Sequence, residues 1–150
     1  MHALAADISD AADSANSQYH STVDQVNSIV KQVADLNTQI AAAGGGNGHA
    51  GDLADQRGVL LDQLGGLADI RVLDRADGTV GVIVGDTMMV DGGVAQQLKT
   101  VTQPGGGLGA EVVGDTRVLQ ISSGTLAGLN QVMTQALPQL QGQLDTLTAN

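Results

Sequence analysis

The chain has 150 residues and a formal net charge of −10, because 16 acidic side chains outweigh 6 basic ones. This acidity argues against partners that are recognised through a basic surface, nucleic acid above all. The sequence contains no cysteine, which excludes disulfides and thiolate metal sites, and no apolar run approaches the roughly 18 residues that a membrane helix requires.

The first part of the chain predicts one very long helix. Residues 4–42 contain no glycine or proline, and mostly apolar positions recur at alternating spacings of four and three. A helix of this length, about 58 Å, is typical of a coiled coil or a rod. We expect the bundle seam of this helix to consist of Ile8, Ala12, Ala15, Tyr19, Thr22, Val26, Ile29, Val33, Leu36 and Ile40.

A glycine-rich segment, 44–48, then predicts the end of the long helix, since glycine tolerates the left-handed conformation of a C-cap. Asp52 is the expected N-cap of a second helix over 52–67. Because the connection is short, the two helices should be antiparallel. One face of the second helix carries Leu53, Leu60, Leu64 and Leu67.

From residue 69 the spacing of apolar residues changes to two. The dipeptide Asp77-Gly78 lies between two alternating apolar segments, which is a strong hairpin signal. Further short apolar runs follow between glycine-rich turns, at 87–90, 94–102, 110–113 and 116–121. We expect a small antiparallel β insertion over 69–121.

The helical period returns in a third helix over 125–149, where Pro138 should kink or restart the helix because its ring removes an internal hydrogen bond. The apolar positions of this helix are Leu126, Leu129, Met133, Leu137, Leu140, Leu144 and Leu147. The sequence therefore predicts a mainly α fold. Residues 1–68 and 122–150 would form an antiparallel three-helix bundle or coiled coil with a very long first helix, and a small antiparallel β lobe would lie between the second and third helices.

No segment combines residue types and spacing in the way that catalysis or cofactor binding requires. Residues 46–51 match the spacing of dinucleotide-binding glycines, but a long helix precedes them where a strand is needed. The three histidines are not paired by spacing, and the serines at 122 and 123 lack the glycine pattern of a nucleophile elbow. We expect no catalytic, cofactor or metal site, and no enzymatic activity.

Arg57 is the one candidate for a specific polar contact. It is the only basic residue between Lys31 and Arg71, and it follows Leu53 on the apolar stripe by four residues. Its stem could lie on the bundle while its guanidinium pairs with an acidic side chain of a neighbouring helix, which would fix the register of the helices. The alternative is a charge that is simply solvated.

Several segments together resemble the bacterial flagellar hook-associated proteins of the hook–filament junction, the FlgK type. The resemblance rests on VNSIVKQVADLNTQI at 26–40 and on DLADQR at 52–57 with its continuation to residue 72. The DGTV hairpin at 77–80 and the serine-glycine step into the last helix at 122–129 agree with it. The resemblance covers nearly the whole chain in order.

This resemblance implies a structural segment of a rod-like subunit outside the cell. Its partners would be copies of itself and other flagellar axial proteins, namely the hook protein and the second junction protein. It implies export by the flagellar type III pathway, with which the lack of a secretory leader agrees. The terminal segments of the family are not recognisable, so we expect an internal fragment that is by itself a monomer or a weak dimer.

Two other functions stay open on the sequence. The chain could be a free-standing coiled-coil adaptor that binds a partner helix through the part of the bundle seam that the shorter second helix leaves uncovered. A β lobe over 69–121 that binds or hydrolyses a ligand is a third possibility.

Overall fold

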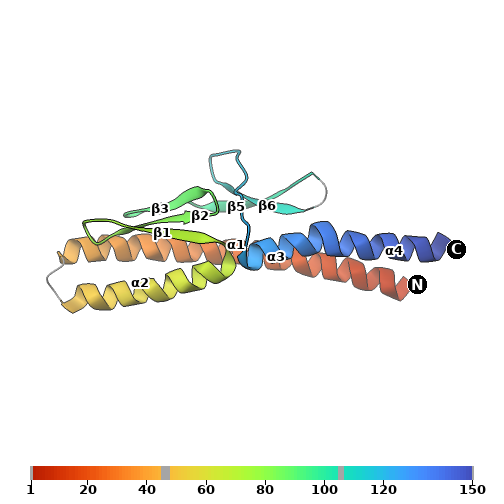
Figure 1. Ribbon diagram of the computed structural model, residues 1–150, viewed down its shortest axis with the longest axis horizontal. Coiled ribbons are helices and arrows are strands. Elements are labelled where there is room, and N and C mark those ends of the chain that lie inside the picture. Colours follow the sequence, from red (N-terminus) through yellow and green to blue (C-terminus); the bar gives the residue numbers. More distant parts are fainter. Residues whose placement is uncertain (1, 45–47, 105–106, 150) are drawn as a thin grey trace.

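A computed structural model describes residues 2–44, 48–104 and 107–149, and it shows an elongated molecule built along one helix (Figure 1). In chain order the elements are α1 (His2–Ala43), α2 (Gly48–Leu67), β1 (Ile70–Asp74), β2 (Val80–Val84), β3 (Thr87–Asp91), β4 (Val94–Ala95), β5 (Leu98–Thr102), β6 (Leu108–Val112), α3 (Gly124–Gln131), the π-helical segment η1 (Val132–Ala136) and α4 (Leu137–Ala149). The very long first helix and the small antiparallel β region expected from the sequence are confirmed.

The helix α1 is one continuous helix of 42 residues. It ends at Ala43 because Gly44 turns the backbone into the left-handed region with φ of 66°. The remainder of the predicted glycine connection, residues 45–47, lies outside the described residues. The helix α2 begins at Gly48, so Asp52 lies inside the helix as an exposed residue, and its assignment as an N-cap is wrong.

The three helical segments do not run side by side as a three-helix bundle. Both α2 and the segment from α3 to α4 run antiparallel to α1, but they lie end to end along it (Figure 1). The reason is length, since α2 has 20 residues and spans about half of α1, which leaves the other half for α3 and α4. The result is two successive helix pairs that share α1.

The β region forms two antiparallel sheets, one with the strand order β1-β2-β3-β4 and one with β5-β6. The predicted run at 94–102 is divided between β4 and β5. The run at 116–121 does not form a strand and contributes only a bridge between Val118 and Glu111. The carboxylate of Asp115 accepts hydrogen bonds from the N–H groups of Thr116 and Arg117, which holds this segment in a turn.

A bulge in β3 lets two successive residues face the core. Val82 pairs with Val90, whereas Ile83 pairs with Met88, so Met89 is the additional residue on the bulged strand. Met89 and Val90 are both fully buried. The bulge therefore increases the apolar area that a short strand brings to the interior.

Pro138 is accommodated by the π-helical segment before it. The N–H of Leu137 donates to the carbonyl of Val132, five residues back, and the wider turn lies where a proline ring would crowd a regular helix. Beyond this point Leu137 and Leu144 are buried, but Leu140 and Leu147 are 48% and 63% exposed. The predicted apolar face of the last helix is thus only partly covered by α1, the helix that packs against it there.

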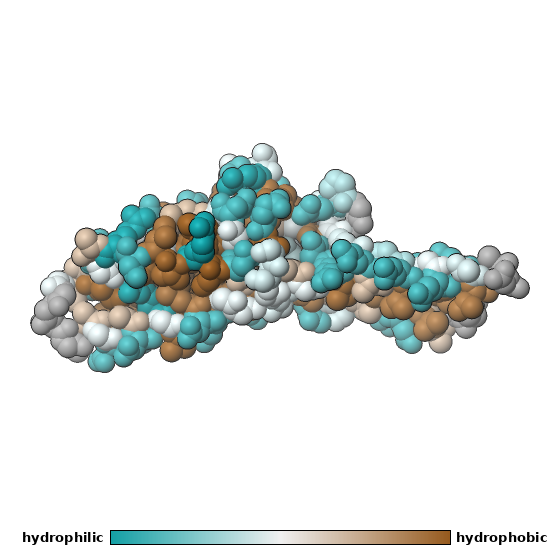
Figure 2. All heavy atoms as spheres, in the orientation of Figure 1, coloured by the Kyte–Doolittle hydropathy of each residue, from teal (hydrophilic) through white to brown (hydrophobic). Residues whose placement is uncertain are grey.

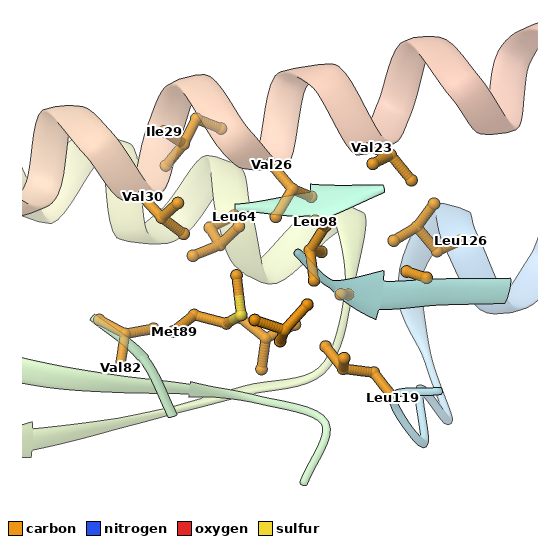
Figure 3. Packing of buried hydrophobic residues seen from close by; sticks show 14 of the residues in the cluster. Val23, Val26, Ile29, Val30, Leu64, Val82, Met89, Leu98, Leu119 and Leu126 are labelled. Atoms are coloured by element: carbon orange, nitrogen blue, oxygen red, sulfur yellow. The ribbon is translucent and has the colours of Figure 1, made fainter. Parts of the chain in front are cut away.

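The core lies where α1 meets α2, α3 and both sheets (Figure 3). Valine side chains of α1 point toward Leu64 of α2, Met89 of β3, Leu98 of β5 and Leu126 of α3. Small branched side chains permit close packing of a helix against thin sheets, which explains how the chain folds with one aromatic residue.

Candidate functional site

The positions of the predicted bundle seam lie mostly in the interior. Ile8 and Ala12 are partly buried, near the free end of the pair that α1 forms with α4. The buried members are Ala15, Tyr19, Thr22, Val26, Ile29, Val33, Leu36 and Ile40. Burial raises the pKa of Tyr19 to about 12, because the charged phenolate would lose its hydration.

A second buried stripe on α1 was missed by the sequence reading. Its members each follow a seam residue directly and face the strands: Val23, Val30, Ala34 and Asn37. The signal was present in the doubled apolar pairs Ile29-Val30 and Val33-Ala34, which indicate an apolar face wider than a coiled-coil seam. The helix α1 therefore serves as the common support of the helices and of the sheets.

Asn37 is the polar centre of this support, and its side chain is fully buried. Its Nδ2 group donates hydrogen bonds of 2.8 Å to the carbonyl oxygens of Val80 and Gly92. Its Oδ1 atom accepts from the N–H of Val80 at 3.1 Å and from Nη1 of Arg57 at 2.9 Å. Both donor hydrogens and both acceptor positions of the amide form hydrogen bonds, so Asn37 fixes the start of β2 and the turn after β3 on α1.

Arg57 reaches across from α2 to the same place. Besides Asn37, its Nη1 atom donates to the carbonyl oxygen of Gly78 at 2.9 Å. Burial lowers the pKa of Arg57, and the charge of Asp74 acts in the opposite direction. The predicted pairing with an acidic residue of a neighbouring helix is wrong, because the partners are an amide and a backbone carbonyl of the β1–β2 turn.

The turn that receives Arg57 is held by Asp77. Its Oδ1 atom accepts hydrogen bonds from the N–H of Thr79 at 3.0 Å and from the Thr79 hydroxyl at 2.6 Å. These hydrogen bonds lower the pKa of Asp77, because they favour the carboxylate form. Gly78 adopts φ of 87°, as the turn requires, and this conformation exposes its carbonyl to Arg57.

Asn27 attaches the second sheet to α1 in the same way, through hydrogen bonds of its side-chain amide. Its Nδ2 group donates to the carbonyl oxygen of Leu98 at 2.9 Å, and its Oδ1 atom accepts from the N–H of Leu98 at 2.7 Å. A side-chain amide with this geometry takes the place of a neighbouring strand residue at the edge of β5. Asn27 and Asn37 together attach both sheets to one helix.

Two glycines allow backbone segments to meet where a side chain would not fit. A Cβ atom on Gly85 would collide with the backbone of Gln120, and one on Gly124 would lie 2.6 Å from the backbone nitrogen of Ala68. Gly85 lies between β2 and β3, and Gly124 begins α3 beside the end of α2. These contacts join the start of the last helix to both the sheet and α2.

Each helix pair leaves a groove with apolar walls and polar rims. The groove between α1 and α2 has a volume of about 410 Å³ and is lined by Gln32, Asp35, Leu36, Gln39, Gln56, Val59 and Leu60. The groove beside η1 measures about 340 Å³ and is lined by Ile8, Ser9, Ala12, Asn16, Met133, Leu137, Pro138 and Gln141. Figure 2 shows apolar residues gathered along the end formed by α4 and the start of α1.

Within residues 2–44, 48–104 and 107–149, no three histidine, cysteine, aspartate or glutamate side chains lie close enough together to hold a metal ion. Among the same described residues, no helix has the length and apolar character needed to cross a membrane.

Comparison with known proteins identifies a family and a similar solved structure. The whole chain, residues 1–150, matches the family described as the flagellar hook-associated protein FlgK helical domain. Among solved structures, the flagellar hook junction protein FlgK from Burkholderia pseudomallei is similar, with 30% sequence identity and a TM-score of 0.69. That match covers 85% of this chain and 25% of the Burkholderia chain, so this chain spans about a quarter of that protein. No curated protein sequence matches.

Proposed function

Because this chain belongs to the FlgK helical-domain family, we propose that it is a structural segment of the bacterial flagellum that joins hook to filament by lateral and axial packing with other flagellar subunits. The observation that carries the proposal is α1, a continuous helix of 42 residues that is covered by different elements along each half. The solved relative is described as a flagellar hook junction protein.

The fold favours stiffness along one axis. A helix alone bends readily, but here α2 supports one half of α1 while α3, η1 and α4 support the other half. Asn27 and Asn37 attach the sheets to the same helix, so sliding of one layer over another would break several buried or partly buried hydrogen bonds at once. Such a body transmits force along its length, as a junction between two tubes requires.

We propose a structural role without catalysis. The polar side chains of Asn37, which is buried, and of Asn27 and Arg57, which are partly buried, form hydrogen bonds that hold elements together. The adaptor alternative required an uncovered part of the bundle seam. The segment from α3 to α4 lies along the part of α1 that α2 does not reach, which removes the basis of that alternative.

The proposed location is extracellular, in the flagellum, after export by the flagellar type III pathway. The proposed partners are copies of the same subunit, the hook protein and the second junction protein. An isolated segment should be a monomer or a weak dimer, because its net charge of −10 opposes association of identical copies.

The test is a deletion of the coding sequence for residues 1–150 in the bacterium that encodes the chain, followed by electron microscopy of the cell surface. We expect hooks without attached filaments and a loss of swimming, both restored by the wild-type gene. Attached filaments of normal length in the deletion strain would overturn the proposal.

A further inference from the structure

The apolar residues of the last helical segment follow a single helical stripe in the sequence. They recur at spacings of three and four residues, at Leu126, Leu129, Met133, Leu137, Leu140, Leu144 and Leu147. A regular α-helix over residues 124–149 would place all of them on one side. In the structure, however, Leu137 and Leu144 are buried, whereas Leu140 and Leu147 are 48% and 63% exposed.

The π-helical segment η1 accounts for this division. The N–H of Leu137 donates to the carbonyl of Val132, five residues back, so η1 contains one residue more than the same turn of an α-helix. One residue corresponds to a rotation of about 100° around the helix axis. Each residue of α4 therefore occupies the place that its predecessor would occupy in a regular helix, and the apolar stripe of α4 is turned relative to that of α3.

The groove beside η1 marks the mismatch between α4 and α1. Gln141 lines this groove from the side of the last helix, together with Ile8 and Ala12 of α1. A volume of about 340 Å³ is left there. In a regular helix Leu140 would occupy the place of Gln141 and would bring an apolar side chain to this groove.

Leu144 would move in the opposite sense. It is buried in the structure, and its successor Asp145 is exposed. In a regular helix Leu144 would take the place of Asp145 and reach the surface. The two registers of α4 therefore differ in the leucine that is exposed, which is Leu140 with the π-helical turn and Leu144 without it.

The helix α3 is fixed in place, so a change of register at η1 would turn α4 instead. Leu126 is a fully buried member of the core. Gly107, next to β6, lies so close to η1 that a Cβ atom on it would be 2.5 Å from Cγ2 of Thr134 and 2.6 Å from Oδ1 of Asn130. The start of the last helical segment is thus held by the core and by the second sheet.

The helix α4 is held less firmly, because the side-chain hydrogen bonds found for it within the described residues run inside the helix. They join Gln141 to Asp145, Thr146 to the carbonyl of Gly142, and Thr148 to the carbonyls of Leu144 and Asp145. These bonds turn with the helix. A rotation of α4 about its axis consequently breaks none of them.

Pro138 distinguishes between the two registers. In a regular α-helix its ring would collide with the carbonyl of Thr134, four residues back, and it has no N–H to donate to that carbonyl. The wide turn of η1 directly before the proline relieves this collision.

We propose that Pro138 and η1 form a register lock, which holds α4 one residue out of phase with α3 and thereby keeps Leu140 and Leu147 on the surface. Without the proline ring, α4 turns into the regular register, Leu140 enters the groove and Leu144 leaves the interior. The register lock thus determines which leucines are presented by the end of the molecule where Figure 2 shows apolar residues gathered.

The test measures the accessibility of single cysteines, since the 150-residue chain has no cysteine of its own. Leu140→Cys and Leu144→Cys are each prepared with Pro138 and with Pro138→Ala, and the rate of labelling by a maleimide is measured. With Pro138, labelling should be fast at position 140 and slow at position 144, in line with exposures of 48% and 5%. In Pro138→Ala it should become about tenfold slower at position 140 and about tenfold faster at position 144. Unchanged rates, or rates that change in the same direction at both positions, overturn the inference.

Deletion of Gln135 in the Pro138→Ala chain is the matched control. Gln135 is an exposed residue of η1, and its removal converts the wide turn into an α-helical turn without rotating α4. Labelling should therefore return to the pattern of the chain with Pro138, and a rate at position 140 that stays slow overturns the inference. Circular dichroism verifies the helix content of each variant. Because Leu140→Cys replaces an exposed side chain, its rates in the three backgrounds are sufficient even if Leu144→Cys does not fold.

Discussion

The guanidinium of Arg57 on α2 donates a hydrogen bond of 2.9 Å to the side-chain carbonyl of Asn37 on α1, inside the joint where the β1–β2 turn meets both helices. The same asparagine is bonded to both backbone groups of Val80. Two side chains from different helices thus hold one turn of the sheet. The pair couples the first helix pair to the sheet, which is the connection on which a rigid rod depends.

We predict that Asn37→Ala destabilises the chain by about 2–4 kcal/mol, because it leaves both backbone groups of Val80 and the carbonyl of Gly92 without a partner in the interior. Arg57→Met should cost about 1 kcal/mol, since it removes two hydrogen bonds but retains the apolar stem. Urea denaturation gives the free energy of unfolding for each variant.

The double variant tests whether the two residues act together. We expect a coupling energy of about 1 kcal/mol in the double-mutant cycle, because Arg57 loses its side-chain partner once Asn37 is gone. The control is Gln39→Ala, an exposed position on the same helix, which should change the stability by less than about 0.5 kcal/mol. Strict additivity of Asn37→Ala and Arg57→Met would show that the hydrogen bond between them is unimportant.

Gly85 and Gly92 provide a matched pair of left-handed residues, with φ of 60° and 59°. A Cβ atom at Gly92 would meet nothing within 4 Å, whereas one at Gly85 would collide with the backbone of Gln120. We predict that Gly92→Ala costs about 1 kcal/mol through conformation alone, and that Gly85→Ala costs about 3 kcal/mol or more because the 120 segment must also move.

Thermal and urea denaturation of the two variants measure this difference. Gly78→Ala is less suitable as a control, because a Cβ there would already lie 3.2 Å from Ile40. Equal costs at Gly85 and Gly92 would mean that the contact between the β2–β3 turn and Gln120 is loose in solution.

The sequence was sufficient to predict α1, because apolar residues that recur at helical spacing over about forty residues without interruption indicate one long helix. The Asp77-Gly78 turn likewise predicted the hairpin of β1 and β2 correctly. Both are local patterns, in which neighbouring residues supply the whole signal. The arrangement of the helices around α1 depended instead on relative length and on the docking of the sheets, which a periodic pattern does not contain.

The roles of Asn27 and Asn37 could not be predicted from the sequence for the same reason. Asparagine on a long helix ordinarily belongs to the solvated face, and the backbone partners of these two residues are 71 positions away for Asn27 and 43 or 55 positions away for Asn37. Arg57 was singled out correctly as a specific contact, but its partner was not the expected acid. A backbone carbonyl becomes an arginine ligand only when a turn presents it, and that depends on the tertiary fold.

Acid should weaken the β1–β2 turn. The pKa of Asp77 in the folded chain is lowered by the hydrogen bonds from Thr79, so the unfolded chain binds the proton more readily. The contribution of Asp77 to stability is therefore present above the ordinary aspartate pKa of about 3.9 and is lost as the pH falls through the lower folded value.

Urea denaturation of the wild type and of Asp77→Asn at several acidic pH values measures this contribution. The variant should be less stable than the wild type at neutral pH, and the difference should shrink below about pH 4. Asp62→Asn, which removes one charge at an exposed position on α2, is the control for the change in net charge. A difference between wild type and Asp77→Asn that grows in acid would contradict the assignment.

Tyr19, a buried member of the hydrophobic core on α1, gives a direct optical measure of the packing around it. It is the only tyrosine and the chain has no tryptophan, so the absorbance of tyrosinate reports on this one side chain. Burial raises its pKa from the ordinary value of 10.0 to about 12 in the folded chain. The raised pKa means that the neutral phenol is favoured by folding, so its contribution to stability is complete below pH 10 and is lost as the pH rises through about 12.

We predict that tyrosinate appears near pH 12 in the native chain and near pH 10 in urea. Tyr19→Phe should remove the part of the alkaline destabilisation that falls in this interval, as measured by circular dichroism at each pH. Titration of Tyr19 near pH 10 with the helix content unchanged would show that the core around Tyr19 opens in solution.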